Sequence, residues 1–234
     1  MWNNYFLQIK KKYNMRVSSK KPLVINLDGK NVTKSREFNI LELYKGGFRE
    51  VVEKCAIYFT KQYDCIAICG ADEISFIIEE PMKLVEDINS DNNTSSTEII
   101  SVFSQMFYDY FNRFYKGENI FWHGKCYSIS DEKIMSFVKY KSRLIEVLTT
   151  TYYLKRAGTN DAGNISLSQK KELCANFDDY EKIKPIEKGR LYKSGKRIDI
   201  DEYLHGNIVE IADDMSEAET NNTVNFEGEI EIEI

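Results

Sequence analysis

Two adjacent acidic residues, Asp72 and Glu73, stand between two apolar runs that are rich in β-branched side chains. The runs, 65–69 and 74–78, have the length of strands, and Gly70 marks a turn between them. The stretch therefore predicts a β-hairpin with carboxylates at its tip. A surface turn would favour Asn-Gly or Asp-Gly, whereas here the acids follow the glycine and begin the returning strand. A carboxylate pair beside buried backbone is costly unless a cation neutralises it, so the hairpin is a candidate metal site, with a solvated turn as the alternative.

A third acid lies upstream, at the end of the apolar run 22–27, where Asp28 is followed by Gly29. Glycine lets the main chain approach a ligand closely, and its carbonyl can face a cation. If the two strands are neighbours, Asp28 meets Asp72 and Glu73 at one end of a sheet. Oxygen ligands in this number suit Mg²⁺, which keeps waters and shares substrate phosphates. Two Mg²⁺ ions about 4 Å apart would clamp an in-line phosphoryl transfer.

The elements around these motifs follow the order of a ferredoxin-like domain. Apolar residues recur at three- and four-residue spacing over 46–62, which predicts a helix between the two acid-bearing strands. After a polar loop over 86–97, a capping box at residues 95–98 opens a second helix with an apolar stripe. Residues 120–129 supply a fourth strand. The order β-α-β-β-α-β predicts an α+β, ferredoxin-like fold.

The C-terminal third is expected to add a helix from Asp131 to about Arg156, a short helix over 167–174 and a strand and turn over 190–200. The last eight residues alternate Glu with Ile, which fits either an edge strand or a disordered tail. We expect three regions: a catalytic domain over 1–130, a C-terminal extension over 131–197 and an acidic tail over 198–234.

Composition narrows the classes of function. With 234 residues and 42% hydrophobic content, the chain is long and apolar enough to fold around a core, and no run is long enough to span a membrane. Only two histidines are present, which argues against a His-rich zinc site and against a Ser-His-Asp triad. Five cysteines without a Cys-x-x-Cys pair indicate reduced thiols and a cytoplasmic location.

Charge is distributed unevenly along the chain. All 32 Lys and Arg residues lie within 1–197, whereas 12 of the 37 acids follow Arg197. The first 197 residues therefore carry a net charge of +7. A basic body with an acidic tail is compatible with a polyanionic partner such as RNA, although a solvated surface explains it as well.

With both acid motifs placed, the chain resembles the tRNA-His guanylyltransferase family of 3′-to-5′ nucleotidyltransferases. The family's first motif, a strand ending in Asp-Gly-Arg-Asn-Phe, is similar to residues 28–32. Its second motif, Gly-x-Ser-Asp-Glu-x-Ser-Phe on a hairpin, is similar to residues 70–76, with one residue fewer before the acids. A weaker similarity runs on to about residue 195, so that the resemblance covers about 23–195.

The resemblance implies a polymerase-like palm with two Mg²⁺ ions held by Asp28, the Gly29 carbonyl and Asp72, with Glu73 as a supporting acid. It implies a nucleotidyltransferase that uses GTP or ATP, acts on tRNA or another RNA, and assembles as a homo-oligomer, a dimer or tetramer. The residues that it implies for nucleotide binding are Asp28, Gly29, Lys30, Asn31, Val32, Thr33, Lys45, Ala71 and Asp72.

The chain also departs from the family pattern. Asn26, Thr33 and Ala71 replace an arginine, a histidine and a serine of the two motifs, and residues 92–98 hold no base where the family has a basic cluster. The family's Trp-Arg and His-x-Asn-Asn signature is replaced around Tyr140, Lys141, Glu146 and Thr149. Metal ligation thus carries over better than acceptor recognition.

Three functions are compatible with these residues. The first is a divergent tRNA-His guanylyltransferase-like enzyme that adds nucleotides to RNA 5′ ends. The second is a palm-type nucleotide cyclase or cyclic-oligonucleotide synthase, because the Gly-x-Asp-Glu hairpin with an upstream Asp strand is also similar to diguanylate cyclases. The third is a non-catalytic module that binds nucleotide or RNA.

Overall fold

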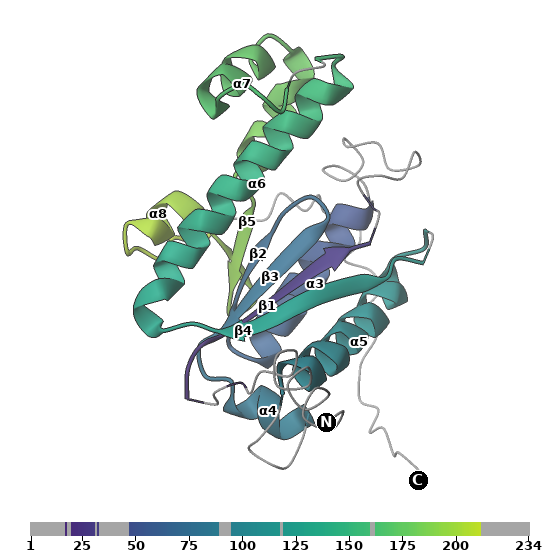
Figure 1. Ribbon diagram of the computed structural model, residues 1–234, viewed down its shortest axis with the longest axis vertical. Helices are drawn as coiled ribbons and strands as arrows, with labels where there is room; N and C mark the ends of the chain where they lie inside the picture. The colour runs from purple at the N-terminus through teal and green to yellow at the C-terminus, as the bar shows by residue number, and fades with distance from the viewer. Residues whose placement is uncertain are drawn as a thin grey trace, which may run out of the picture.

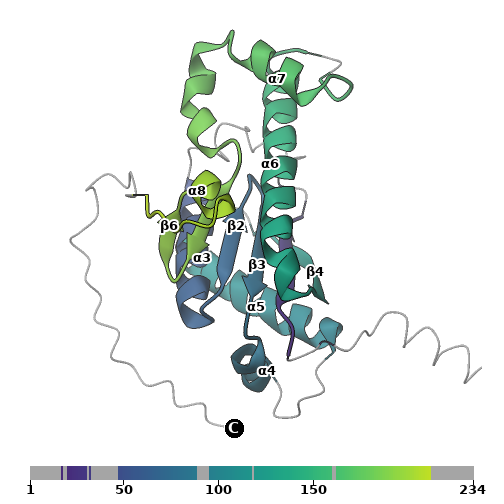
Figure 2. The ribbon, with the colours of Figure 1, turned by 90° about the vertical axis from the view of Figure 1, so that its left-hand side faces the viewer.

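The computed structural model describes residues 17, 20–30, 32, 47–88, 95–117, 119–159 and 162–211. Its helices and strands carry the labels of Figure 1. One sheet lies at the centre with helices on both of its faces, and the long helix α6 (Ile134–Arg156) extends beyond the ends of the strands (Figures 1 and 2).

Within the described residues the sheet has six strands in the order β4-β1-β3-β2-β5-β6, and all of the neighbouring pairs are antiparallel. The strands are β1 (Leu23–Gly29), β2 (Ile66–Cys69), β3 (Glu73–Ile78), β4 (Trp122–Ser128), β5 (Arg190–Lys193) and β6 (Lys196–Ile198). The first four strands have the order of a ferredoxin-like sheet, in which β1 lies between β4 and β3. The predicted α+β fold with a β-α-β-β-α-β core is therefore confirmed.

The helices fall into two groups along the chain. Between the first four strands lie α3 (Gly47–Gln62), α4 (Met82–Ile88) and α5 (Ser96–Phe114). After β4 come the 3-10 turn Asp131–Lys133, α6, α7 (Leu167–Cys174), the 3-10 turns Asp178–Lys182 and Lys184–Ile186, and α8 (Ile200–Leu204). The predicted helices over 46–62, 131–156 and 167–174 are all present. The polar loop expected over 86–97 is shorter than predicted, because α4 continues to Ile88 with Leu84 and Val85 buried, and α5 begins at Ser96.

One face of the sheet is covered by α3 and α5. The capping box that starts α5 is present, since the Ser95 side chain accepts from the Glu98 amide and the Glu98 carboxylate accepts from the Ser95 amide. From there the apolar stripe of α5 packs into an aromatic core with α3 and the sheet. Phe103 lies 5.1 Å from Phe59 of α3 and 5.2 Å from Phe76 of β3, measured between ring centroids. The stripe is therefore core, as predicted.

The opposite face is covered by α6, with α8 beside it. Val138 and Ile145 of α6 belong to the same buried cluster as Val24 of β1, Ile68 of β2 and Ile77 of β3. Because strand side chains alternate between faces, every second residue of β1, β2 and β3 points at α6. A polar residue at one of these positions therefore faces α6.

Two strands from the C-terminal third extend the palm-like sheet. Arg190–Lys193 pairs with β2, and Lys196–Ile198 pairs with β5 in a tight hairpin. Ile198 and Ile200 are buried in the α6-side core, so the first residues of the segment 198–234 pack onto the sheet. The last eight residues lie outside the described residues.

None of the helices in the described part of the chain combines the length and the apolar composition needed to cross a bilayer. All five cysteines are free thiols.

Candidate functional site

The two acid motifs meet at one end of the sheet. In the antiparallel pairing of β1 with β3, Asp28 stands directly opposite Glu73. One step further along, the Gly29 amide donates a hydrogen bond of 2.8 Å to the Asp72 carbonyl. The two strand ends are therefore neighbours, as predicted. The register places Asp28 opposite Glu73, and Gly29 is bonded to Asp72.

Asp28 and Glu73 lie on the same face of the sheet. Leu27 of β1 and Ile74 of β3 are buried in the core under α3 and α5, so their neighbours Asp28 and Glu73 turn to the α6 side. Residues directly opposite on one face have Cβ atoms about 4.5–5.5 Å apart, and like charges there repel. Asp72 lies in the bend before β3, so the alternation of the strand does not set the direction of its half-buried side chain.

A buried lysine from α6 neutralises Glu73. The Lys141 ammonium lies 2.8 Å from Glu73 Oε2, and the side chains are only 6% and 19% exposed. The other carboxylate oxygen, Oε1, is buried and has no hydrogen-bond partner among the described residues. Glu73 is therefore half-satisfied: one oxygen is paired with a cation and the other remains an acceptor.

Neighbouring charges shift the pKa of Asp28 in opposite directions. Partial burial raises the pKa of the Asp28 carboxyl above its ordinary value, and the negative charge of Glu73 raises it further. His123 and Lys141 act in the opposite direction on the same pKa. His123 belongs to β4 and stands directly opposite Asp28 on the side away from β3. An added cation would relieve the repulsion between the two carboxylates and favour the charged form of Asp28.

The backbone at this strand end is tightly packed. A Cβ on Gly29 would lie 2.7 Å from Val32 Cγ2 and 3.3 Å from Ile120 Cγ2, so a larger residue would displace the Val32 side chain. The Lys30 amide donates to the Phe121 carbonyl at 2.8 Å. The amides of Gly29 and Lys30 are therefore already engaged. Amide contacts to a phosphate from the predicted 28–33 segment would have to come from residues beyond Lys30.

The hairpin tip is held from the C-terminal extension. The Gly70 amide donates to the Glu73 carbonyl at 2.8 Å, which closes the turn. The Arg190 guanidinium of β5 donates to the Gly70 carbonyl at 3.1 Å and forms an ion pair of 2.9 Å with Glu53 of α3. Arg190 is 2% exposed. A buried arginine with these partners fixes the position of the turn that carries both hairpin acids.

Other predicted residues are distributed as follows. Lys30 is exposed at the end of β1, Val32 is buried under the turn, and Ala71 is buried in the hairpin. Asn31, Thr33 and Lys45 lie outside the described residues. His123, Lys141 and Arg190 are additions that sequence reasoning did not assign to the site. For Lys141 there was a signal, because it interrupts the apolar stripe of Ile134, Val138 and Ile145 with a lysine.

The donor set fits a hard divalent cation in part. Two carboxylates at the strand ends, the Gly29 carbonyl and the orphaned Glu73 oxygen are all oxygen ligands, which Mg²⁺ prefers. Within the described residues, no three side chains of His, Cys, Asp or Glu gather closely enough to hold a metal on their own. A cation here would therefore need the backbone carbonyl, water or substrate oxygens to complete its coordination.

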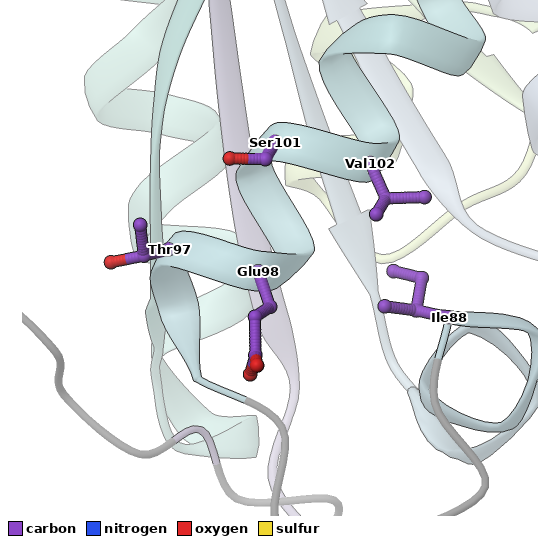
Figure 3. A pocket seen from close by; sticks show the side chains of 5 residues that line it. All are labelled: Ile88, Thr97, Glu98, Ser101 and Val102. Atoms are coloured by element: carbon purple, nitrogen blue, oxygen red, sulfur yellow. The ribbon is translucent and has the colours of Figure 1, made fainter.

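Among the described residues, cavities also lie away from the strand-end acids. One, of about 240 Å³, is formed between α4 and α5 and is lined by Ile88, Thr97, Glu98, Ser101 and Val102 (Figure 3). It lies beyond the end of β3, which is the end of the sheet opposite to Asp28. Another, of about 570 Å³, is an open groove on the outer side of α6, next to Lys188 and Asp201. Neither is lined by the strand-end acids.

The fold is that of known guanylyltransferase structures. A bacterial tRNA(His) guanylyltransferase-like protein in complex with ATP superposes with a TM-score of 0.55 at 14% sequence identity, over 82% of this chain and 88% of that one. The corresponding complex with GTP gives a TM-score of 0.55 at 15% identity, over 85% of each chain. The tRNA(His) guanylyltransferase of Saccharomyces cerevisiae gives 0.51 at 16% identity, over 76% of this chain and 88% of that one.

Sequence comparison alone does not reveal this likeness. No protein-family model matches the chain, and no curated protein is similar to it in sequence. The palm-like architecture inferred from the acid motifs is thus confirmed at the level of the fold.

Proposed function

We propose that this protein is a divergent tRNA-His guanylyltransferase-like nucleotidyltransferase that adds nucleotides to RNA 5′ ends by metal-dependent phosphoryl transfer. The observation that carries the proposal is the meeting of Asp28–Gly29 with Asp72–Glu73 at one end of β1 and β3. The similar structures of the bacterial protein were captured with ATP and with GTP, which supports a nucleotide as one substrate.

In this proposal Asp28, the Gly29 carbonyl and Asp72 hold Mg²⁺, up to two ions, and Glu73 is a supporting acid. The metal would position the reacting phosphates and offset the charge that develops in the transition state. Lys30, Asn31, Val32, Thr33, Lys45 and Ala71 would contact the nucleotide. The nucleotide is GTP or ATP and the acceptor is tRNA or another RNA.

Two further properties belong to the proposal. Five free cysteines, four of them buried, suit the reducing cytoplasm. The tRNA-His guanylyltransferase resemblance favours a homo-oligomer, a dimer or tetramer.

Incubation with labelled GTP or ATP and Mg²⁺, with and without bulk tRNA, tests the proposal. We expect label on tRNA, dependent on Mg²⁺ and lost in Asp28→Asn. A labelled small-molecule product would instead identify a palm-type cyclase or cyclic-oligonucleotide synthase. No product with either nucleotide, from a protein that still binds nucleotide or RNA, would identify a non-catalytic binding module.

A further inference from the structure

Lys141 occupies a position that a helix normally gives to an apolar residue. Ile134, Val138 and Ile145 form the stripe of α6 that packs on the sheet, and Lys141 lies within the same stripe and is 5% exposed. A lysine is almost never buried to this extent without a charged partner, because the ammonium loses its hydration. Its partner is Glu73, at 2.8 Å.

Glu73 is also the residue opposite Asp28, so Lys141 acts on both acids. Asp28 stands directly opposite Glu73 in the pairing of β1 with β3, and the Lys141 ammonium lies 2.8 Å from Glu73 Oε2, so the three charged groups are gathered at one strand end. In a palm that binds divalent ions, the cations neutralise the strand-end carboxylates. Here one positive charge is already supplied by the protein, covalently attached to α6 and shielded from solvent by the surrounding core.

We propose that Lys141 is a positioning residue that serves as the permanent counter-ion of Glu73 and keeps this carboxylate out of the metal ligand set. The divalent cation then binds through Asp28, the Gly29 carbonyl and Asp72, while Glu73 stays with Lys141. This inference rests on the proposed function, because it concerns the metal site of that function. It assigns Glu73 a role that differs from direct coordination.

Removal of the Lys141 charge should therefore release Glu73 as an additional ligand. It also removes a positive charge from the surroundings of the proposed metal, which would repel a cation. We expect Lys141→Met to bind Mn²⁺ at least about tenfold more tightly than the unaltered protein. Lys141→Arg keeps the charge and should bind Mn²⁺ like the unaltered protein.

The experiment is a titration of the full-length protein with Mn²⁺ alone, with free Mn²⁺ followed by electron paramagnetic resonance. Lys139→Met is the matched control, because Lys139 is exposed on the same helix two residues earlier. Its Mn²⁺ affinity should not change. Unchanged or weaker binding in Lys141→Met, or an equal gain in Lys139→Met, would overturn the inference.

A second variant keeps the test decisive if Lys141→Met fails to fold. The double variant Glu73→Gln with Lys141→Met removes both members of the ion pair and leaves the net charge of the site unchanged. If Glu73 is not a ligand, this protein binds Mn²⁺ like the unaltered one. Weaker binding by tenfold or more would show that Glu73 coordinates the metal, and the inference would be wrong.

Asp28→Asn separates this inference from the proposed function. Mn²⁺ binding that is lost in Asp28→Asn but is insensitive to Lys141→Met retains the metal site and removes only the role of Lys141. No Mn²⁺ binding in any of the variants or in the unaltered protein overturns both.

Discussion

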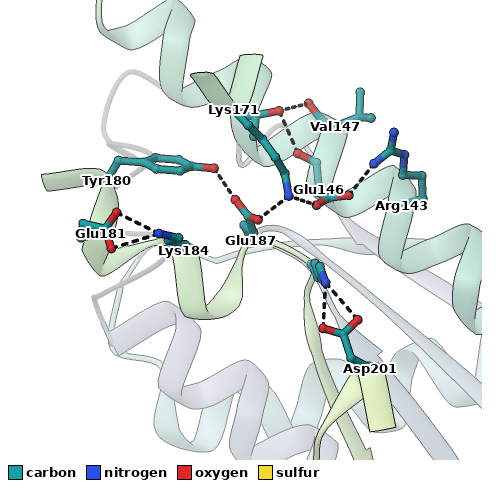
Figure 4. A network of polar contacts seen from close by, with 11 residues as sticks. Arg143, Glu146, Val147, Lys171, Tyr180, Glu181, Lys184, Glu187 and Asp201 are labelled. Atoms are coloured by element: carbon teal, nitrogen blue, oxygen red, sulfur yellow. Dashed lines mark hydrogen bonds and ion pairs between the residues drawn. The ribbon is translucent and has the colours of Figure 1, made fainter. Parts of the chain in front are cut away.

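Helix α6 carries two buried ionic clusters, and they differ in how completely their acids are satisfied. Towards its N-terminal half, Glu73 has one oxygen bound to Lys141 and one oxygen without a partner among the described residues, and it faces a second acid, Asp28. Towards its C-terminal half, Glu146 and Glu187 share Lys171, and each of their remaining oxygens has a donor as well (Figure 4). Those donors are Arg143 for Glu146, at 2.9 Å, and the Tyr180 hydroxyl for Glu187, at 2.6 Å.

The difference separates a cluster whose polar groups are all satisfied from one whose polar groups are not. A polar network in which every member has its partners makes the fold rigid, and the cluster at Lys171 joins α6, α7 and the segment before β5. A network with an orphaned acceptor and an excess of negative charge is destabilising unless water satisfies the acceptor and a cation offsets the charge. The cluster at Glu73 has that character, and it lies at the strand ends where the metal is proposed.

The largest effect is expected from Asp72→Asn, which tests the proposed metal site at the strand ends. It removes the charge that is proposed to bind the metal without changing the shape of the side chain, so turnover should fall by about a thousandfold or more, the equivalent of several kcal/mol of charge stabilisation. The melting temperature should change little. The measurement is Mg²⁺-dependent nucleotide incorporation, with Asp131→Asn, an exposed acid outside the site, as the control. Activity close to that of the unaltered protein would remove Asp72 from the metal site.

The sequence indicated where the three acids lie in the fold but not which residues pair with them, and the reason is physical. Asp28, Asp72 and Glu73 lie at the ends of apolar runs, and strand length and turn residues are local properties that a sequence displays directly. The ion pair between Lys141 and Glu73 joins residues 68 positions apart, and the contact between Arg190 and Gly70 joins residues 120 positions apart. Contacts of that range depend on how helices and strands pack, which no local pattern encodes.

Helix α4 shows that a local pattern also fails to predict an element when the element is short. It has seven residues and buries only Leu84 and Val85, so its apolar periodicity spans barely two turns. The polar residues that follow it led to a predicted loop over 86–97, which includes the last turn of the helix. Long elements such as α5, with four buried aromatic or aliphatic positions at helical spacing, were predicted because their pattern repeats several times.

Lys171→Met tests the cluster in which Glu146 and Glu187 share Lys171. It leaves two carboxylates that are 6% and 9% exposed without their shared cation. Removal of one partner of a fully buried ion pair costs about 3–5 kcal/mol. We expect about 2 kcal/mol here, because Lys171 is 38% exposed and Arg143 and Tyr180 remain. Urea unfolding measures the loss, and turnover measured at 15 °C should be retained. A large loss of turnover with unchanged stability would reverse the roles of the two clusters.

Tyr180→Phe tests the same cluster through its dependence on pH. Burial, and next the hydrogen bond to Glu187, raise the pKa of the Tyr180 hydroxyl well above its ordinary value of about 10. The unfolded chain therefore releases this proton as the pH rises above about 10, while the folded protein keeps it, so the stability due to Tyr180 is present below that pH and is lost above it. At pH 8 the variant should be less stable by about 1.5–3 kcal/mol, the range for a hydrogen bond to a charged group.

The difference between Tyr180→Phe and the unaltered protein should narrow between about pH 10 and pH 11, where folding is still measurable by urea titration. Tyr140→Phe is the control, because Tyr140 is exposed and lies outside the cluster, and its difference in stability should stay constant over this range. For Tyr180→Phe, a difference in stability that stays constant over this range would show that the hydroxyl contributes nothing specific to the buried network.

Lys184→Met sets the baseline for both clusters and should have the smallest effect. Lys184 forms an ion pair of 3.1 Å with Glu181, three residues earlier in the chain, and the two side chains are 60% and 65% exposed (Figure 4). Exposed pairs at this spacing contribute about 0.2–0.5 kcal/mol and are screened by salt. The difference in stability should therefore vanish in 1 M NaCl, whereas most of the loss in Lys171→Met should persist, because its carboxylates are shielded from the solvent. A salt dependence shared by both variants would mean that burial does not distinguish the Lys171 cluster from an ordinary surface pair.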